Sequence, residues 1–258
     1  MVDQNIKEIL DNAYLKFNQK NFIENDPISI PHLFTKKEDL EIAGFFAATL
    51  AWGNRKSIIK NCTKLLDLMD MQPHDFILNH SKKELKLFEK FVHRTFNTID
   101  CCYFIISLKN IYINHKGLSA IFNSNKNDIA YHISNFRKIF FELNHLSRTE
   151  KHVSNPLKNS SSKRLCMYLR WMVRKDSFGV DFGIWNHIKP SQLYLPLDVH
   201  TGNVSRYLGL LNRKQNDWKA VTELTEILKL YDSKDPVKYD FSLFGLGIDG
   251  LTKKINFL

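Results

Sequence analysis

The sequence predicts an all-α protein, and three observations lead to that class. Glycine and proline are few, at 10 and 7 of 258 residues, whereas all-β chains usually need more turn residues. Apolar residues recur at helical spacing in one segment after another. The strict apolar and polar alternation of half-buried strands is scarce. With 43% hydrophobic residues, the chain is long enough to bury one large core or the cores of two small lobes.

The first half of the chain predicts a series of helices. An amphipathic pattern indicates a helix over residues 3–20, with Asp3 as its N-cap, followed by a loop over 21–34. A second helix is expected after Thr35, with Glu38 completing a capping box. It is apolar on most faces as far as residue 51, which is typical of a central helix. Further helices are expected over 56–69, 73–80, 81–92, 100–112, 118–122 and 127–143.

The second half contains two irregular stretches. Residues 147–162 form the most loop-like segment, interpreted as a hinge between lobes or a DNA-facing loop, and residues 175–197 form an irregular connection with Gly179, Gly183 and Pro190. Helices are expected at 163–174, 199–208, 218–231 and 236–244.

Composition limits the classes of partner and cofactor. The formal net charge of +10 favours a polyanion such as DNA, RNA or an anionic lipid surface. No apolar run approaches the roughly 20 residues that a membrane span needs, and the N-terminus lacks the pattern of a secretion signal, so a cytoplasmic protein is expected. The cysteines form no Cys-x-x-Cys pair, and the histidines have no metal-ligand spacing. We therefore expect buried thiols, no metal and no cofactor.

Lys163 is the first candidate for chemistry. Residues 160–162 are three serines that precede a helix, and one of them is expected to cap it. Lys163 then lies in the first turn, where the helix dipole and the neighbouring Arg164 both disfavour its charge. A neutral amine is what a Schiff-base nucleophile requires. The alternatives are a solvated lysine or a contact to a phosphate held by the same helix end.

Asp198 is the second candidate. It ends the extended segment 196–198 and is a predicted N-cap for the helix that starts at Val199. Capping alone would account for an aspartate at this place. A carboxylate held by backbone N–H groups also stays ionised, so it is suited to stabilise positive charge on a sugar or to accept a proton from a lysine.

The surroundings of both residues resemble the helix-hairpin-helix DNA glycosylase superfamily. Residues 196–210, PLDVHTGNVSRYLGL, resemble its Val-Asp-Thr-His-Val-x-Arg segment, and residues 163–172, KRLCMYLRWM, resemble its Lys-Thr-Ala-opening helix. The resemblance places Lys163 as the nucleophilic lysine of bifunctional members and Asp198 as the catalytic aspartate. His200 matches the family histidine, and Arg206 lies near the family arginine but out of register.

The chain departs from the superfamily pattern in three ways. Residues 159–162, NSSS, replace the Leu-Pro-Gly-Val-Gly hairpin, the spacing from Lys163 to Asp198 is longer than in the endonuclease III branch, and a C-terminal four-cysteine cluster is missing. In all three it is similar to the archaeal 8-oxoguanine DNA glycosylase branch. The whole chain also resembles an uncharacterised bacterial family of conserved hypothetical proteins, through AWGNR at 51–55, RTFN at 94–97 and DFSLFGLG at 240–247.

The resemblance implies a two-lobed helical glycosylase fold with an atypical hairpin and a DNA cleft between the lobes. The expected lobes are residues 36–145 and residues 1–35 together with 146–258. The expected DNA contacts are Asn54, Arg55, Ser161, Ser162, Arg164, His200 and Arg206, with a helix C-cap as the alternative role of Asn54. The expected pocket for a flipped base consists of Trp52, Trp171, Trp185, Asp240 and Phe241, any of which could instead be part of the core.

The implied function is DNA repair by base excision. The expected protein is a monomeric, nucleoid-associated DNA glycosylase that acts on double-stranded DNA containing a damaged base such as 8-oxoguanine. Lys163 would form the Schiff base and Asp198 would assist it, which adds AP-lyase activity to base removal. Two other classes stay open: a non-catalytic helical DNA- or RNA-binding protein, and a helical scaffold whose basic character is incidental.

Overall fold

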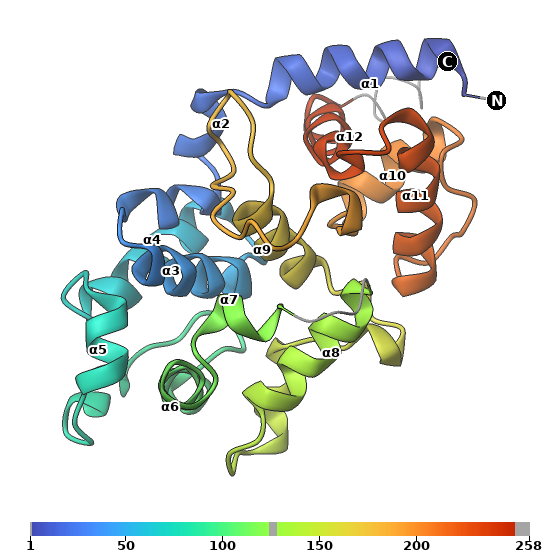
Figure 1. Cartoon of the computed structure of the whole chain (residues 1–258). Helices are drawn as coiled ribbons and strands as arrows, with labels where there is room; N and C mark the ends of the chain where they lie inside the picture. Colours follow the sequence, from blue (N-terminus) through green and yellow to red (C-terminus); the bar gives the residue numbers. More distant parts are fainter. Residues whose placement is uncertain (1, 124–127, 251–258) are drawn as a thin grey trace. The chain divides into compact units, whose positions relative to one another are not determined.

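A computed structural model describes residues 2–123 and 128–250, and it confirms the all-α class. This part of the chain contains helices and turns, no strand, and two isolated bridges, His93 with Phe96 and Ser160 with Asp217. The chain forms two compact units (Figure 1). The central unit is residues 23–155, and the terminal unit combines 1–22 with 156–258. The predicted lobe boundaries lie instead at 35–36 and 145–146. No helix in the described ranges is both long enough and apolar enough to cross a membrane.

The central unit is organised around α3. Its helices are α3 (Lys37–Leu50), α4 (Arg55–Asp67), α5 (Pro73–Asn79), α6 (Thr98–Asn114), α7 (Leu118–Ile121) and α8 (Ile129–Phe140), with 3-10 turns η1 (Pro27–Ser29), η2 (Pro31–Leu33), η3 (Glu84–Phe88) and η4 (Ser147–His152). Every residue of α3 from Asp39 to Leu50 is buried, which confirms the prediction of a central helix. The ring of Phe45 contacts Phe104 of α6 and Phe136 of α8 at centroid distances of 5.7 and 5.5 Å. The core of the unit therefore lies between these three helices.

Two predictions for the central unit are wrong. The helix α3 begins at Lys37 with Lys36 as N-cap and without a side-chain cap, so the capping box of Thr35 and Glu38 does not form. The box requires Thr35 itself to be the N-cap, and the helix starts one residue too late for that. The predicted helix over 81–92 is only the 3-10 turn η3, because Phe88 and Phe91 alone are buried in a segment that is otherwise largely exposed, which leaves its first turns without a buried apolar face.

The terminal unit brings the two ends of the chain together. It contains α1 (Gln4–Phe17), η5 (Pro156–Lys158), α9 (Lys163–Val173), η6 (Pro190–Gln192), α10 (Val199–Tyr207), α11 (Trp218–Tyr231), η7 (Pro236–Lys238) and α12 (Tyr239–Ile248); α2 (Lys20–Glu24) spans the boundary with the central unit. Asp3 caps α1 as predicted. The helix α1 lies along α12 (Figure 1), where Ser242 Oγ donates to the Leu10 carbonyl at 2.7 Å.

The irregular segment 175–197 folds back on α9 and carries Asp181 to it. The N–H groups of Phe182 and Trp185 donate to the Trp171 and Met172 carbonyls near the end of α9, both at 2.9 Å. Gly183 makes this return possible: it has φ +58°, and a Cβ at this position would lie 2.4 Å from the Lys175 Cβ. Apart from η6 the segment is irregular, as predicted.

Candidate functional site

Lys163 lies at the N-terminal end of α9, as predicted, but its cap is unusual. Ser162 is the N-cap residue, yet it has φ +48° in the left-handed region and its side chain makes no capping hydrogen bond. Its Oγ donates to the Ser160 carbonyl at 3.4 Å instead. The prediction that a serine side chain caps this helix is wrong, because the left-handed backbone turns the hydroxyl away from the first-turn N–H groups.

Asp198 is the N-cap of α10, as predicted, and its two carboxylate oxygens have different partners. Oδ1 accepts from the Thr201 N–H at 2.9 Å, and Oδ2 lies 3.3 Å from Lys163 Nζ. The side chains are 30% exposed for Lys163 and 17% for Asp198, so the pair is sheltered but reachable from solvent. The capping bond fixes one edge of the carboxylate, which leaves the other edge directed at the amine.

A polar chain behind Asp198 holds its backbone in place. Asn216 Nδ2 donates to the Asp198 carbonyl at 3.0 Å, and Arg206 donates to Asn216 Oδ1 at 2.6 Å. Arg206 Nε also donates to the Arg213 carbonyl at 2.8 Å. A Cβ at Gly202 would lie 2.7 Å from the Asn216 amide, so the arrangement requires glycine there. Arg206, a predicted DNA contact, thus has a positioning role in the structure.

The loop that replaces the expected hairpin is braced by the start of α11. Asn159 has φ +60°, its carbonyl accepts from the Trp218 N–H at 3.2 Å, and its side chain donates to Asp217 Oδ2 at 3.0 Å. Asp217 caps α11, and its hydrogen bonds with Arg213 hold its pKa far below the usual range. The start of α11 thus holds this loop in place. Residues 159 and 162 of the loop adopt left-handed backbone conformations although neither is glycine.

A buried row of charges continues along α9 from Lys163. Arg170 lies two turns further on, with Arg174 one turn beyond it, so the three cations share a face of the helix. Arg170 pairs with Asp240 of α12 and with Asp181, and Arg174 Nη1 pairs with Asp181 Oδ2 at 3.1 Å. Arg174 also pairs with Asp176 and Asp235 and donates to the Tyr14 hydroxyl of α1.

Asp240 connects this row to the candidate pair electrostatically. It is 7% exposed, and burial raises the pKa of its carboxyl to about 7. The positive charge of Arg170 opposes that rise, the charge of Asp198 adds to it, and the charge of Lys163 opposes it. Asp240 was predicted to line a base pocket. The structure places it as a buried carboxyl that pairs with Arg170, within the electrostatic reach of Lys163 and Asp198.

The predicted aromatic pocket residues of the terminal unit are buried. Trp171 and Trp185 are both 0% exposed. Phe241 is 1% exposed, and the centroid of its ring lies 4.2 Å from the Arg170 guanidinium carbon. Trp185 packs edge-on against Tyr168 at 5.4 Å. These rings form the core around the charge row, and none of the three presents surface to a base in this conformation.

Two further predicted DNA contacts lie near the helix ends that carry the pair. Arg164 follows Lys163, is partly buried, and has its pKa lowered by burial to about 10, so it remains charged at neutral pH. His200 is exposed in the first turn of α10, with its ring 6.1 Å from Phe244 and with Gly247 directly against it.

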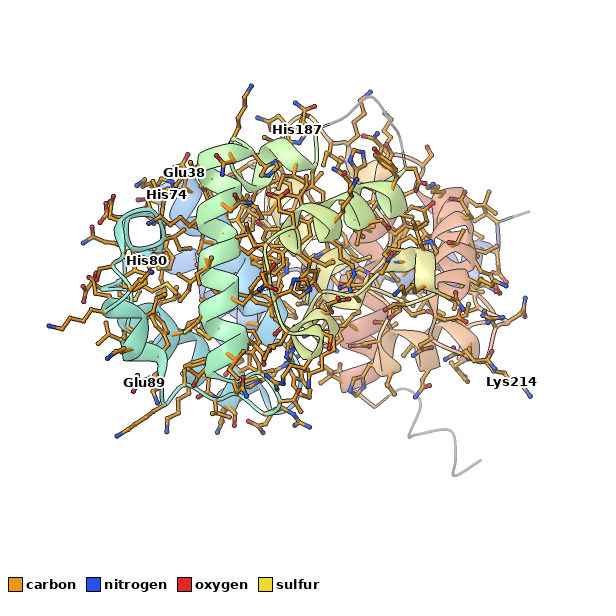
Figure 2. All side chains as sticks on the ribbon, turned by 90° about the horizontal axis from the view of Figure 1, so that it is seen from below. Glu38, His74, His80, Glu89, His187 and Lys214 are labelled. Atoms are coloured by element: carbon orange, nitrogen blue, oxygen red, sulfur yellow. The ribbon has the colours of Figure 1, made fainter. Side chains whose placement is uncertain are left out.

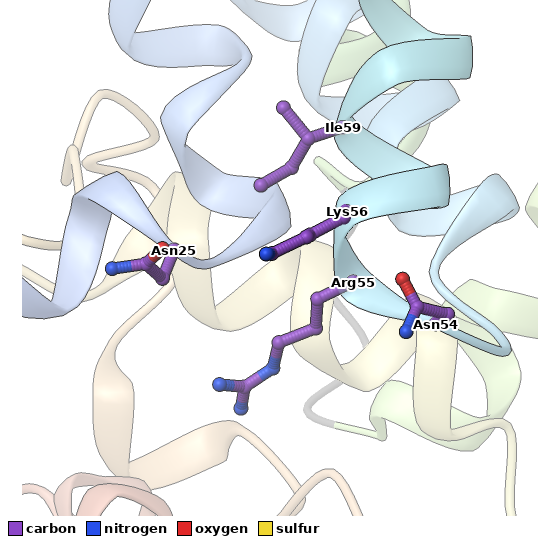
Figure 3. Close-up of a pocket in the computed structure, with 5 residues that line it drawn as sticks. All are labelled: Asn25, Asn54, Arg55, Lys56 and Ile59. Carbon is purple, nitrogen blue, oxygen red and sulfur yellow. The ribbon is translucent and has the colours of Figure 1, made fainter.

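The other predicted residues belong to the central unit. Asn54 caps the start of α4 by accepting from the Ser57 N–H at 3.2 Å, so the alternative of a helix C-cap is wrong. Arg55 lies 3.9 Å from Asp26. Asn54 and Arg55 line an open pocket together with Asn25, Lys56 and Ile59 (Figure 3). Trp52 is half-buried just before this turn.

The sequence reasoning did not identify the buried arginines of α9. Arg170 and Arg174 occur one turn apart on the apolar face of a strongly amphipathic helix, where an unpaired charge would be costly. That placement is a detectable signal for a buried ionic cluster. The partners come from three other segments, and nothing in their spacing indicates that they meet.

Two histidines of the central unit and the four cysteines make structural contacts or are free thiols. No three or more His, Cys, Asp or Glu side chains of the described ranges are grouped to hold a metal ion. His74 packs edge-on against Tyr112, and His80 Nδ1 lies within hydrogen-bond distance of two backbone carbonyls at the end of α5. Figure 2 labels both histidines. The four cysteines are free, and three of them are buried, which agrees with the expected small hydrophobic role.

Comparison with known proteins gives one match. A family described as "Protein of unknown function (DUF2400)" matches residues 26–249, which is most of the chain. No curated protein matches the chain, and no solved structure matches it.

Proposed function

The chain belongs to the DUF2400 family of proteins of unknown function, and we propose that it is a DNA repair glycosylase with AP-lyase activity. One observation carries the proposal: Lys163 Nζ lies 3.3 Å from Asp198 Oδ2 at the meeting point of two helix N-termini. A lysine and a carboxylate in hydrogen-bond reach form a nucleophile with its proton acceptor. The sequence resemblance to helix-hairpin-helix glycosylases assigns these two residues the same roles.

The surroundings of Lys163 combine positive and negative groups. Lys163 lies at the positive end of the α9 dipole and next to Arg164, and Asp198 Oδ2, 3.3 Å from Nζ, is placed to accept the proton that the amine must lose before it attacks. The Thr201 N–H holds Oδ1 of the Asp198 carboxylate in place. The same carboxylate would stabilise positive charge that develops on the deoxyribose.

The proposed chemistry has two stages. Nζ forms a bond to C1′ while the glycosidic C–N bond breaks, and the base leaves with the electron pair and takes up a proton. Asp198 accepts the proton that Nζ loses after the attack, and the sugar C1′–O4′ bond opens as this proton passes to O4′, which gives a protonated Schiff base on Lys163. Loss of a C2′ proton expels the 3′ phosphate by β-elimination, and water hydrolyses the imine to return free Lys163. An oxidised purine such as 8-oxoguanine is the proposed substrate base.

Local geometry supports a DNA strand at this helix end. Ser162 provides no side-chain cap, so its side chain does not occupy the N-terminus of α9, and that end is suited to a backbone phosphate. Ser161, Arg164 and His200 are the proposed neighbouring contacts. DNA binding without base contacts would then depend on salt through released counterions.

Borohydride trapping tests the proposal. The full-length protein is incubated with duplexes that contain 8-oxoguanine, uracil or an abasic site, and borohydride reduces any Schiff base to a stable protein–DNA adduct. We expect an adduct that is lost in Lys163→Gln and reduced at least about 100-fold in rate in Asp198→Asn, because general-base assistance typically contributes that much. Peptide mapping should place the reduced sugar on Lys163.

Variants elsewhere separate chemistry from folding. Lys219→Gln removes an exposed lysine from α11 and should leave trapping unchanged. An adduct that persists in Lys163→Gln would disprove the assigned nucleophile. Intact duplex binding without any adduct would favour the alternative function, a non-catalytic DNA- or RNA-binding protein.

A further inference from the structure

The turn that carries Arg94 in the central unit adopts a backbone conformation suited to glycine. His93 and Phe96 exchange two backbone hydrogen bonds of 2.8 and 3.0 Å, so Arg94 and Thr95 are the central residues of a tight turn. Arg94 has φ +56°, and Thr95 is not in the left-handed region. A positive φ at the first central position alone is the type II′ pattern, in which glycine is the favoured residue. An arginine here stores strain.

Arg148 and the first residues of α6 hold this turn in place, which allows the backbone strain to persist. Arg148 Nη2 donates to the Thr95 carbonyl at 3.1 Å, and its Nη1 bonds to Asn97 and to the buried Asp100 at 2.7 and 2.8 Å. Asn97 and Asp100 form the capping box of α6. Arg94 is therefore presented from a rigid base rather than from a mobile loop.

The Arg94 side chain lies on an aromatic surface. Its guanidinium carbon is 4.5 Å from the centroid of the Trp52 ring, and Arg94 itself is exposed. A Cβ at Gly53 would lie 2.7 Å from Arg94 Nη1, so the guanidinium rests against the backbone of the turn between α3 and α4. The guanidinium makes no hydrogen bond or ion pair with the side chains of the described ranges. One planar face contacts the indole, and its donors remain free.

The residues that follow Gly53 in the sequence add positive charge and line a pocket. Arg55 and Lys56 begin α4 directly after Asn54, and both project from the same side of the helix into the pocket that Asn25 and Ile59 complete (Figure 3). Asp26 balances Arg55 at 3.9 Å, whereas Lys56 is exposed. The surface thus combines a stacked cation, amide groups and at least one unbalanced lysine.

We infer that Arg94, stacked on Trp52, binds an unstacked nucleobase of a nucleic-acid strand, whose neighbouring phosphate is bound by Lys56 and Arg55. A guanidinium offers a flat face for stacking and donors for base edges or phosphate, and Trp52 fixes its plane. The inference names a nucleic-acid contact in the central unit. It requires no chemistry at Lys163, so its failure and that of the proposed glycosylase are separately observable.

The key variant is Arg94→Gly, because it separates binding from folding. Glycine relieves the positive φ, so the variant should retain or raise the melting temperature of the full-length protein. Affinity for a labelled single strand containing 2-aminopurine should fall about tenfold or more, as is typical when a stacking side chain is lost. The change in 2-aminopurine emission on binding, which reports removal of the base from its stacked neighbours, should disappear. Arg94→Lys keeps the charge and should lose most of this emission change.

A control variant and two binding comparisons define the ligand. Lys83→Gln removes an exposed charge at the start of η3 in the same unit and should change neither the affinity nor the emission change on binding. Matched DNA and RNA strands show which nucleic acid is preferred, and polyglutamate tests for simple attraction of anions. The inference is overturned if Arg94→Gly binds as tightly as wild type, if its melting temperature falls while the affinity of the folded fraction is unchanged, or if polyglutamate competes as well as the strand.

Discussion

The carboxylates around α9 outnumber the cations that face them. Lys163, Arg170 and Arg174 lie on one face of the helix. Five aspartates pair with these cations or lie within their electrostatic reach: Asp176, Asp181, Asp198, Asp235 and Asp240. Burial of excess negative charge is unfavourable, and protonation of one carboxyl removes a charge at a smaller cost in free energy than leaving it buried. Burial raises the pKa of Asp240 to about 7 and also raises the pKa of Asp235. The pair Lys163 and Asp198 therefore lies beside a group that changes charge near neutral pH.

Replacing Asp240 with asparagine should change the pH dependence of stability. Between about pH 4 and about pH 7 the folded protein keeps a proton on Asp240 that the unfolded chain has lost, so the free energy of unfolding falls as pH rises through this window. Asp240→Asn cannot titrate, and its stability should fall less, by on the order of 1 to 4 kcal/mol. Urea denaturation at about pH 5 and about pH 8 measures the difference.

A control for this experiment is Asp75→Asn, which changes an exposed aspartate of α5. It should show the same pH dependence as the wild type. If Asp240→Asn also follows the wild-type dependence, Asp240 is not the group that holds the proton.

At the residue scale, the sequence predicted the local positions of the two candidate residues better than their surroundings. The cap position of Asp198 and the first-turn position of Lys163 follow from local patterns, and the structure places both there. The distance of 3.3 Å between them depends on how the segment 175–197 returns, which no local pattern determines. For the same reason the sequence did not show that Arg206 bonds to Asn216 or that Trp171 is wholly buried.

At the element scale, the contact between α1 and α12 determines how the N-terminus joins the terminal unit. The ring of Phe17 lies against Gly245, where a Cβ would come within 2.2 Å of the ring atoms. Tyr239 and Ser242 of α12 add hydrogen bonds of 2.9 and 2.7 Å to Asp11 and to the Leu10 carbonyl. The close approach of the two helices thus depends on the missing side chain at residue 245.

Gly245→Ala should destabilise the protein by about 1–3 kcal/mol, because the added methyl group overlaps the Phe17 ring and forces the helices apart. Thermal or urea denaturation measures the loss. In a Phe17→Ala background the same substitution should cost much less, since the obstructing ring is gone. Equal costs in both backgrounds would mean that the helix contact is not the origin of the effect.

The helical spacing of apolar residues predicted most of the helices, and the errors have local physical causes. The predicted helix over 218–231 coincides with α11, where Asp217 provides a side-chain cap and the apolar positions repeat over the whole length. The errors lie at the start of α3 and where a short turn replaces a helix: Lys36 starts α3 without a capping box, and the segment 81–92 forms only the 3-10 turn η3. Such choices depend on local capping and burial, which periodicity does not encode.

At the scale of the whole molecule, the unit boundaries differ from the predicted ones because of packing. Residues 27–33 form η1 and η2, which pack against α3, so they belong to the central unit rather than with α1. Residues 147–152 form η4, which packs on α6 through Thr149 and His152, both bonded to Asp100. Loop composition marks these segments as connections, but their contacts assign them to the helices that they cover.

The net charge of +10 leads to a prediction about binding to nucleic acid. If cations neutralise phosphates, the logarithm of the affinity should fall linearly with the logarithm of salt concentration, and each lost phosphate contact should reduce the slope by roughly one. Lys56→Gln is expected to reduce it by that amount on a duplex and on a single strand, whereas Lys83→Gln is expected to leave it unchanged. Fluorescence anisotropy over a series of salt concentrations gives both slopes. Affinity that does not respond to salt would instead favour a helical scaffold whose basic character is incidental, since a polyanion cannot bind a cationic surface without releasing counterions.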